Sequence, residues 1–168
     1  IFLPWTRALP EIYEETYHEN LLEHLPELFW ELPEGKLSAV RWRFENLVTD
    51  LFVKTYCRKI GDWCREHNLY LTGHVMGEGS LSDQTQAVGD AMRCYRAFVL
   101  PGIDMLCDFH EYTTAKQTAS IVHQNGAEGM LSELYGVTGW DYDFRGYKLQ
   151  GDWQAALGVT VRVPHLAW

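Results

Sequence analysis

The sequence has few features of a membrane-bound, secreted or nucleic-acid-binding protein. It contains no run of about 18 apolar residues, and its first residues show no signal-peptide pattern, so we expect no membrane partner. The 14 Lys and Arg residues form no cluster and are outnumbered by 23 Asp and Glu, for a net charge of −9. Phosphate backbones are therefore poor partners, and we expect no nucleic acid to bind. Nothing in the sequence indicates a localisation.

Cysteine pairs and glycine-rich nucleotide motifs are also missing. Cys57, Cys64, Cys94 and Cys107 are scattered without a CxxC spacing, so we predict small buried hydrophobic residues rather than a zinc site or a disulfide framework. The chain has neither GxGxxG nor GxxxxGK[ST]. We therefore predict no cofactor and no dedicated metal site.

Aromatic residues are plentiful, at 14% of the chain with seven Trp and nine Tyr. Flat amphipathic rings suit a carbohydrate site, because the faces of sugars are apolar C–H surfaces edged by hydroxyl groups. Aromatic residues also fill hydrophobic cores, which is the more common role of any single ring.

Apolar strand candidates alternate with amphipathic helix candidates. The strand candidates begin at residues 69, 103, 130 and 159, so a βα unit repeats about every 30 residues. That is the period of a (β/α)8 barrel of about 250 residues. The expected helices cover residues 10–30, 38–68, 82–99, 113–125 and 148–157. Within the first, Pro26 should start or kink a second short helix, and Thr113 or Thr114 should cap the fourth.

The fold class that these patterns favour is α/β, of the (β/α)8 TIM-barrel type. A doubly wound open sheet has a similar period, but it usually carries a glycine-rich phosphate turn. Four or five strands cannot close an eight-stranded barrel. We therefore treat residues 1–168 as a single, incomplete catalytic barrel domain that holds only the C-terminal part, an internal piece of a longer protein. Missing sequence or a second copy would supply the other strands, and Ile1-Phe2 is a possible remnant of one more.

Polar and aromatic side chains stand at the expected carboxyl ends of all four strands, where the active sites of such barrels lie. Cleavage of a glycosidic bond needs two carboxyl groups, and aromatic neighbours stack on sugars and raise carboxyl pKa values. We assign Glu133 and Glu78 as the candidate catalytic pair. We expect five further residues at these strand ends to contact the substrate: His74, Asp104, Tyr135, Trp140 and His165.

Each assignment has an alternative. Glu133 could be a structural carboxylate paired with Arg145 or Arg162, and Asp104 could serve to fix its strand. A third possibility is a metal-dependent hydrolase, in which Asp108, His110 and Glu111, three potential ligands in one short loop, hold an ion.

The order of these segments resembles the catalytic barrel of large bacterial glycoside hydrolases, in particular the α-L-rhamnosidase-like group, which is itself similar to the β-galactosidase clan. The matching stretches cover most of the chain: PWTRALPEIYEETY, LYLTGHVMGEGSL, PGIDML, SELYGVTGW and LQGDWQAALGVTVRVPH. The individual motifs are short, so their order along the chain counts for more than any one of them.

By this resemblance Glu133 takes the position of the catalytic glutamate near the end of the seventh strand, as nucleophile or base. Glu78 is then a substrate or catalytic carboxylate, and His74 and His165 bind sugar hydroxyls. Related sequences carry Asp-Glu-Pro before Pro-Trp-Thr, whereas Leu3 precedes Pro4 here, which leaves Glu78 as the candidate acid. The leading hypothesis is a glycosidase acting on a carbohydrate substrate; the second is a non-catalytic carbohydrate-binding or structural fragment of such a barrel.

Overall fold

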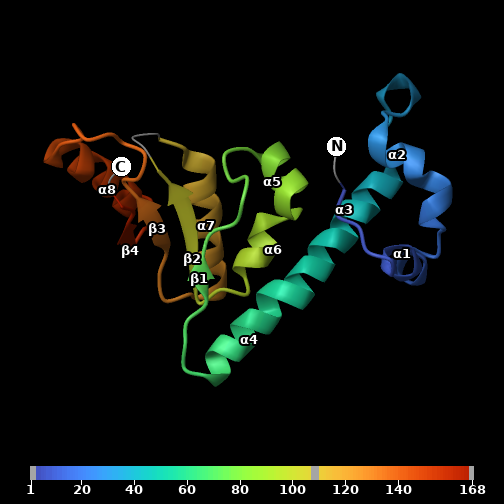
Figure 1. The fold of residues 1–168 in the computed structure, drawn as a ribbon, viewed down its shortest axis with the longest axis horizontal. Coiled ribbons are helices and arrows are strands. Elements are labelled where there is room, and N and C mark those ends of the chain that lie inside the picture. Colours follow the sequence, from blue (N-terminus) through green and yellow to red (C-terminus); the bar gives the residue numbers. More distant parts are fainter. Residues whose placement is uncertain (1–2, 107–109, 167–168) are drawn as a thin grey trace. The chain divides into compact units, whose positions relative to one another are not determined.

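The computed structural model describes residues 3–106 and 110–166. The chain divides into two compact units, Ile1–Leu51 and Phe52–Trp168. All four strands of the predicted barrel belong to the second unit (Figure 1). The suggested strand remnant Ile1-Phe2 and the residues Cys107 and Asp108 lie outside the described residues.

The first unit is helical. It contains α1 (Leu9–Tyr17), the 3-10 turn η1 (Leu21–His24), α2 (Leu25–Phe29), the turn η2 (Pro33–Gly35) and most of α3 (Ala39–Phe52). Pro26 stands in the first turn of α2, as the sequence predicts. The core of this unit is apolar and includes the fully buried Tyr13, Leu21 and Phe44. The pKa of Tyr13 is raised to about 12, because burial and its bond to Glu19 disfavour the phenolate.

The long helix expected over residues 38–68 is confirmed, with one interruption. Ser38 caps it by accepting a hydrogen bond from the Arg41 N–H at 3.0 Å. After α3 the chain passes through η3 (Val53–Cys57), a π-helical turn, and continues as α4 (Arg58–Glu66). The apolar spacing of the sequence did not predict this turn. π-turns are frequent at functional positions.

The second unit is a mixed α/β structure with a four-stranded parallel sheet. The strands are β1 (Thr72–Gly73), β2 (Leu100–Met105), β3 (Leu131–Leu134) and β4 (Val161–Pro164), in the spatial order β1-β2-β3-β4. The four predicted strands are therefore present, with shifted bounds and with β1 much shorter than the expected 69–75. A doubly wound sheet reverses its strand order at a switch point, and this sheet does not. It is compatible with part of an α/β barrel.

Helices connect the strands. α5 (Leu81–Val88) and α6 (Ala91–Tyr95) lie between β1 and β2, α7 (Tyr112–Asn125) between β2 and β3, and α8 (Phe144–Ala156) between β3 and β4. One continuous helix over 82–99 is wrong, because Gly89 has a φ of +76° and Asp90 caps a new helix.

Two predicted helix starts are also wrong. Glu111, not a threonine, caps α7, since its carboxylate accepts the Thr113 and Thr114 N–H groups. Asp143 caps α8, which begins four residues before Lys148.

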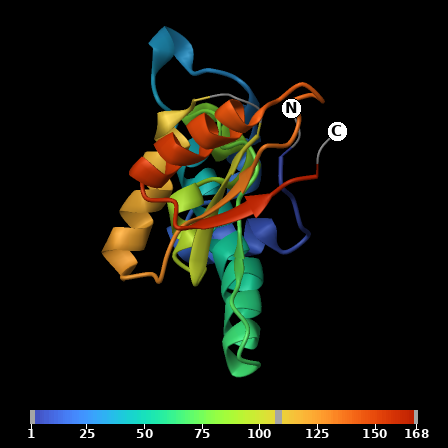
Figure 2. The same ribbon diagram turned by 90° about the vertical axis from the view of Figure 1, so that its left-hand side faces the viewer.

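The two faces of the sheet differ. Ile103 and Met105 pack with Ala115 and Ala119 of α7, and the same core includes side chains of α8. Figures 1 and 2 show α7 and α8 on this side of the strands. Side chains alternate along a strand, so the residues between these apolar ones face the other way. That opposite face carries the candidate site.

Candidate functional site

Two carboxylates stand side by side on neighbouring strands. Asp104 of β2 and Glu133 of β3 are register partners in the parallel ladder. Both side chains are about one-third exposed, at 34% and 31%. Since both belong to the face opposite α7 and α8, the sheet itself sets their proximity, and both remain open to a ligand.

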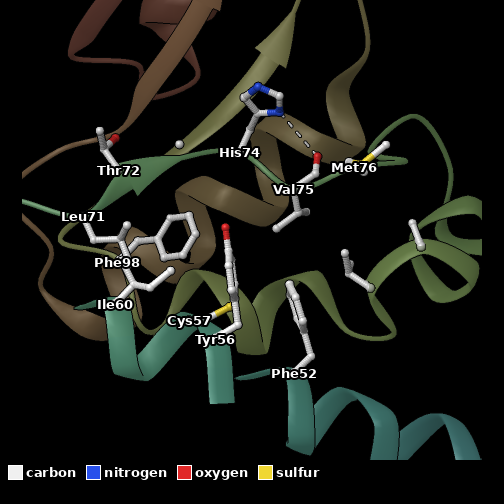
Figure 3. A pocket seen from close by; sticks show the side chains of 13 residues that line it. Phe52, Tyr56, Cys57, Ile60, Leu71, Thr72, His74, Val75, Met76 and Phe98 are labelled. Atoms are coloured by element: carbon white, nitrogen blue, oxygen red, sulfur yellow. Dashed lines mark hydrogen bonds between the residues drawn. The ribbon is translucent and has the colours of Figure 1, made fainter. Parts of the chain in front are cut away.

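His74 follows β1 and completes the group. Its Nε2 lies 3.4 Å from Glu133 Oε2 and 3.9 Å from Asp104 Oδ2. Its Nδ1 lies 4.0 Å from Oε1 of Glu78 and also contacts the Val75 carbonyl at 3.5 Å (Figure 3). The imidazole therefore has one nitrogen toward the two exposed carboxylates and the other toward the buried one.

Asp104 has the environment of a proton donor. Burial raises the pKa of its carboxyl group, and the neighbouring charge of Glu133 raises it further, while His74 and His165 act in the opposite direction. Its Oδ1 is buried and has no hydrogen-bond partner within the described part of the chain. A carboxyl group held in this way keeps its proton to a higher pH than an ordinary aspartate.

Glu78 is placed differently. Only 8% of the residue is exposed, and its carboxylate accepts hydrogen bonds from three donors of the fold. Oε1 accepts from the Tyr95 hydroxyl at 2.5 Å and the Val75 N–H at 3.2 Å, and Oε2 accepts from the Asp104 N–H at 2.8 Å. Burial raises the pKa of Glu78, although these hydrogen bonds oppose the shift.

The backbone around Glu78 is equally constrained. Its carbonyl accepts hydrogen bonds from Gln84 Nε2 and from the Thr114 hydroxyl. The loop after β1 is thus tied to β2, α5, α6 and α7 at one residue. Glu78 therefore holds Asp104 in place through the N–H of Asp104 itself, and His74 through the N–H of the next residue, Val75.

The segment after β3 has strained backbone. Tyr135 and Val137 have φ values of +73° and +60°, which non-glycine residues rarely adopt, least of all a β-branched one. Tyr135 is buried and its ring packs against Tyr147 of α8 at 4.6 Å, on the helix side of the sheet. Such outliers concentrate at functional sites, and these two lie in the loop shortly after Glu133.

His165 and Gly136 lie against each other. The His165 N–H donates to the Leu134 carbonyl at 2.8 Å, which brings the residue beside the end of β3. A Cβ atom added to Gly136 would lie 2.7 Å from the imidazole of His165. This close packing explains the glycine, and the charge of His165 is one of the influences that lower the pKa of Asp104.

Trp140 extends from the same loop and is 86% exposed. Phe144, at the start of α8, is 91% exposed. Neither ring is used by the core of this unit, so both are available to a ligand. The expected role of Trp140 as a platform for a sugar stays a prediction.

Two of the three residues in the metal-binding loop of the third hypothesis have other contacts. Both carboxylate oxygens of Glu111 cap α7, and the His110 ring packs against Trp153 at 4.8 Å. Asp108 lies outside the described residues. His74, Asp104 and Glu133 instead offer one donor atom each within 4.8 Å of one another. This grouping was not predicted as a metal site.

Comparison with known proteins identifies no relative: no protein-family model matches the chain, and no curated protein or solved structure is significantly similar to it. None of the helices in the described ranges is long and apolar enough to cross a membrane. The fold and the site define the protein as a mixed α/β structure in which two carboxylates and an imidazole gather at parallel strands.

Proposed function

We propose that the protein hydrolyses a glycosidic bond with Glu133 and Asp104 as its carboxyl pair. The observation that carries the proposal is the pairing of these two partly exposed carboxyl groups across β2 and β3, with His74 in contact with both. Glycosidases need one carboxyl that is protonated and one that is ionised. The raised pKa of Asp104 supports the first role for it and leaves the second to Glu133.

The separation of the two groups favours retention of configuration. One oxygen of each lies within 4.8 Å of the other, which leaves little room for a water molecule between carboxylate and sugar. Glu133 would attack the anomeric carbon while Asp104 gives its proton to the departing oxygen. The glycosyl ester on Glu133 would then be cleaved by water, whose proton returns to Asp104. His74, whose Nε2 lies 3.4 Å from Oε2 of Glu133, would hold this carboxylate in position.

Glu78 is the alternative acid. Asp104 is the better candidate for the general acid. A general acid must reach the leaving oxygen, whereas both carboxylate oxygens of Glu78 already accept hydrogen bonds from the fold. We infer that Glu78 positions the site rather than donating a proton. His165, Trp140 and Tyr135 remain candidates for substrate contact, and Tyr135 would act mainly through the loop that it anchors.

We also propose that the sheet is the C-terminal part of a (β/α)8 barrel. Sequential parallel order, helices on one face and polar groups on the other are the pattern of such a barrel. The remaining strands would come from another segment of polypeptide or from a second copy. This arrangement would enclose the carboxyl pair at the mouth of the barrel.

A second candidate function has one specific observation in its favour. The donor atoms of His74, Asp104 and Glu133 are close enough to bind one divalent cation, and a His with two carboxylates is a common ligand set. The reaction would then be a metal-assisted hydrolysis, in which Glu133 binds the ion and is not a nucleophile.

The test is hydrolysis of a panel of aryl glycosides by the full chain and by Glu133→Gln. We expect a loss of about 100- to 10,000-fold in kcat/KM, and no change for Glu15→Gln, which alters an exposed carboxylate in the first unit. For substrates with good leaving groups, Asp104→Asn should spare kcat/KM, because their departure needs no proton, and should lower kcat, because Asp104 also accepts the proton of the attacking water. Activity that disappears with EDTA and returns with a divalent cation would support the metal candidate. Sugar binding without turnover of any glycoside would contradict both.

A further inference from the structure

The hydroxyl group of Tyr95 lies directly against the carboxylate of Glu78. Tyr95 belongs to α6 and is 1% exposed, and its hydroxyl donates a hydrogen bond to Oε1 of Glu78 at 2.5 Å. The other two donors to this carboxylate are backbone N–H groups, those of Val75 and Asp104. Within the described part of the chain, Tyr95 is therefore the one side chain that donates a hydrogen bond to Glu78.

The ring of Tyr95 is fixed by the core of the second unit. It lies in one hydrophobic cluster with the buried side chains of Cys57, Val75, Cys94 and Ile121. It also makes an edge-to-face contact with Phe98, at 5.9 Å between the ring centres. A closely packed aromatic ring holds its hydroxyl at one position, because the packing leaves few rotamers open to it. The core thus determines where Oε1 of Glu78 lies.

The carboxylate of Glu78 takes the place of a strand beside β2. β1 pairs with β2 only through its two residues, Thr72 and Gly73, whereas β2 continues to Met105. Beyond the end of β1 the N–H of Asp104 has no strand partner on that side, and it donates to Oε2 of Glu78 at 2.8 Å. The last part of β2 therefore depends on a side chain where a neighbouring strand would ordinarily accept the hydrogen bond.

The segment that carries His74 depends on the same two groups. The Val75 N–H lies 3.2 Å from Oε1 of Glu78 and 3.4 Å from the hydroxyl oxygen of Tyr95. Without the hydroxyl, the Glu78 carboxylate would lose its side-chain donor and could turn away from the Asp104 N–H. The apolar contacts of the ring would remain, since they do not involve the hydroxyl.

We propose that Tyr95 is a positioning residue of the active site, which acts through Glu78 to hold Asp104 where its carboxyl group reaches the leaving oxygen. This inference rests on the proposed function, because it takes Asp104 as the general acid. A positioning role differs from a purely structural one in its effect on different substrates. Loss of stability lowers the amount of folded enzyme and slows every substrate by the same factor, whereas a displaced acid slows the substrates that need its proton.

The experiment compares kcat/KM for two aryl glycosides of one sugar, a phenyl glycoside with a poor leaving group and a dinitrophenyl glycoside with a good one. In Tyr95→Phe we expect a loss of about 10- to 100-fold for the phenyl glycoside and of less than about threefold for the dinitrophenyl glycoside. Equal losses for the two substrates would overturn the proposal.

Tyr13→Phe is the matched control. Tyr13 is also fully buried, and its hydroxyl also donates to a glutamate, Glu19, at 3.1 Å, but it lies in the first unit. The same atom is thus removed from a similar environment that has no contact with Glu78. Any loss of stability in Tyr13→Phe should leave the ratio of the two kcat/KM values as it is in the wild type.

Amide hydrogen exchange tests the same contacts without a substrate. In the wild type the Val75 and Asp104 N–H groups should be protected, and the Tyr95 hydroxyl proton should give a separate NMR signal that exchanges slowly with water. In Tyr95→Phe both amides should exchange at least about tenfold faster, while the N–H of the buried Ile121 in α7 keeps its protection.

The exchange measurement separates failure of this proposal from failure of the proposed function. Unchanged exchange of the Asp104 N–H in Tyr95→Phe would overturn the proposal, whatever the kinetics. Faster exchange in a protein that hydrolyses no glycoside would support the link from Tyr95 to Asp104 and contradict the glycosidase. If Tyr95→Phe does not fold, the wild type decides, because an unprotected Asp104 N–H or a rapidly exchanging Tyr95 hydroxyl would also overturn the proposal.

Discussion

Asp104 and Glu133 are register partners on adjacent parallel strands, and both carboxylates contact Nε2 of the same imidazole, that of His74. Two carboxylates this close repel each other when both are ionised, and His74 offsets the repulsion only when it is protonated. The group is therefore an electrostatic unit rather than three independent residues. Changing His74 or Glu133 is therefore expected to alter the pKa of Asp104.

The first prediction concerns Asp104 and pH. Because its folded-state pKa is raised, the protonated form is favoured in the fold, so its contribution to stability is present at low pH and is lost as the pH rises through the raised value. Asp104→Asn does not titrate. The free energy of unfolding, measured by urea denaturation between pH 4 and 8, should therefore fall less steeply in this variant than in wild type.

Asp62→Asn is the control for this measurement, because Asp62 is exposed and paired with Arg65 on the surface. Glu78 also has a raised pKa and keeps its own contribution in the Asp104 variant. The free energy of unfolding of Asp104→Asn should therefore still fall with rising pH, but less steeply than that of the wild type. An unchanged slope would mean that Asp104 titrates normally and is not suited to be the acid.

The second prediction concerns Glu78. Its two oxygens face only donors, from Val75, Tyr95 and Asp104. In Glu78→Gln the amide NH2 must face at least one of these donors, so a buried hydrogen bond is replaced by a repulsive contact. We expect a loss of about 1–3 kcal/mol in unfolding free energy. Glu128→Gln is the control, since Glu128 accepts a bond from the Tyr70 hydroxyl at an exposed site. Equal stability of the two variants would contradict the positioning role.

Much of this fold could be predicted from hydrophobic periodicity. The four strands, their alternation with helices and the long helix of residues 38–68 are all present. The errors occur where a local interaction decides the structure. A turn at Gly89 splits one helix, and side-chain caps at Glu111 and Asp143 move two others. β1 is short because the loop from Val75 onward is held by Glu78 and not by strand pairing.

The sequence predicted which residues belong to the candidate site but not how they are arranged in it. Barrel spacing alone placed His74, Asp104 and Glu133 at strand ends, and the structure brings the three together. The sequence could not distinguish the burial of Glu78 from the exposure of Asp104, because this depends on contacts with distant residues such as Tyr95. Strand alternation does predict which face of the sheet carries Asp104, because neighbouring side chains point to opposite faces and Ile103 and Met105 pack in the core.

The third prediction concerns Gly136. A Cβ atom there would lie 2.7 Å from the His165 imidazole, closer than non-bonded atoms approach, so Gly136→Ala must displace the ring. If His165 belongs to the active site, kcat should fall about 10- to 100-fold, because small misplacements of functional groups slow catalysis strongly. Gly79→Ala is the matched control, with no atom within 4 Å of the added Cβ. The shift of the His165 ring can be followed by NMR, and full activity despite that shift would remove His165 from the site.

The last prediction separates substrate binding from chemistry at Trp140. The indole is 86% exposed, so Trp140→Ala should change the free energy of unfolding by less than about 0.5 kcal/mol. If the ring stacks on a sugar equally in the ground state and the transition state, its loss raises KM and leaves kcat unchanged. A rise of about tenfold corresponds to roughly 1.4 kcal/mol of lost binding. Trp30→Ala, at an exposed tryptophan of the first unit, should leave KM unaltered. A fall in kcat with KM unchanged would instead place Trp140 against the reacting bond, and no change in either would exclude it from the substrate site.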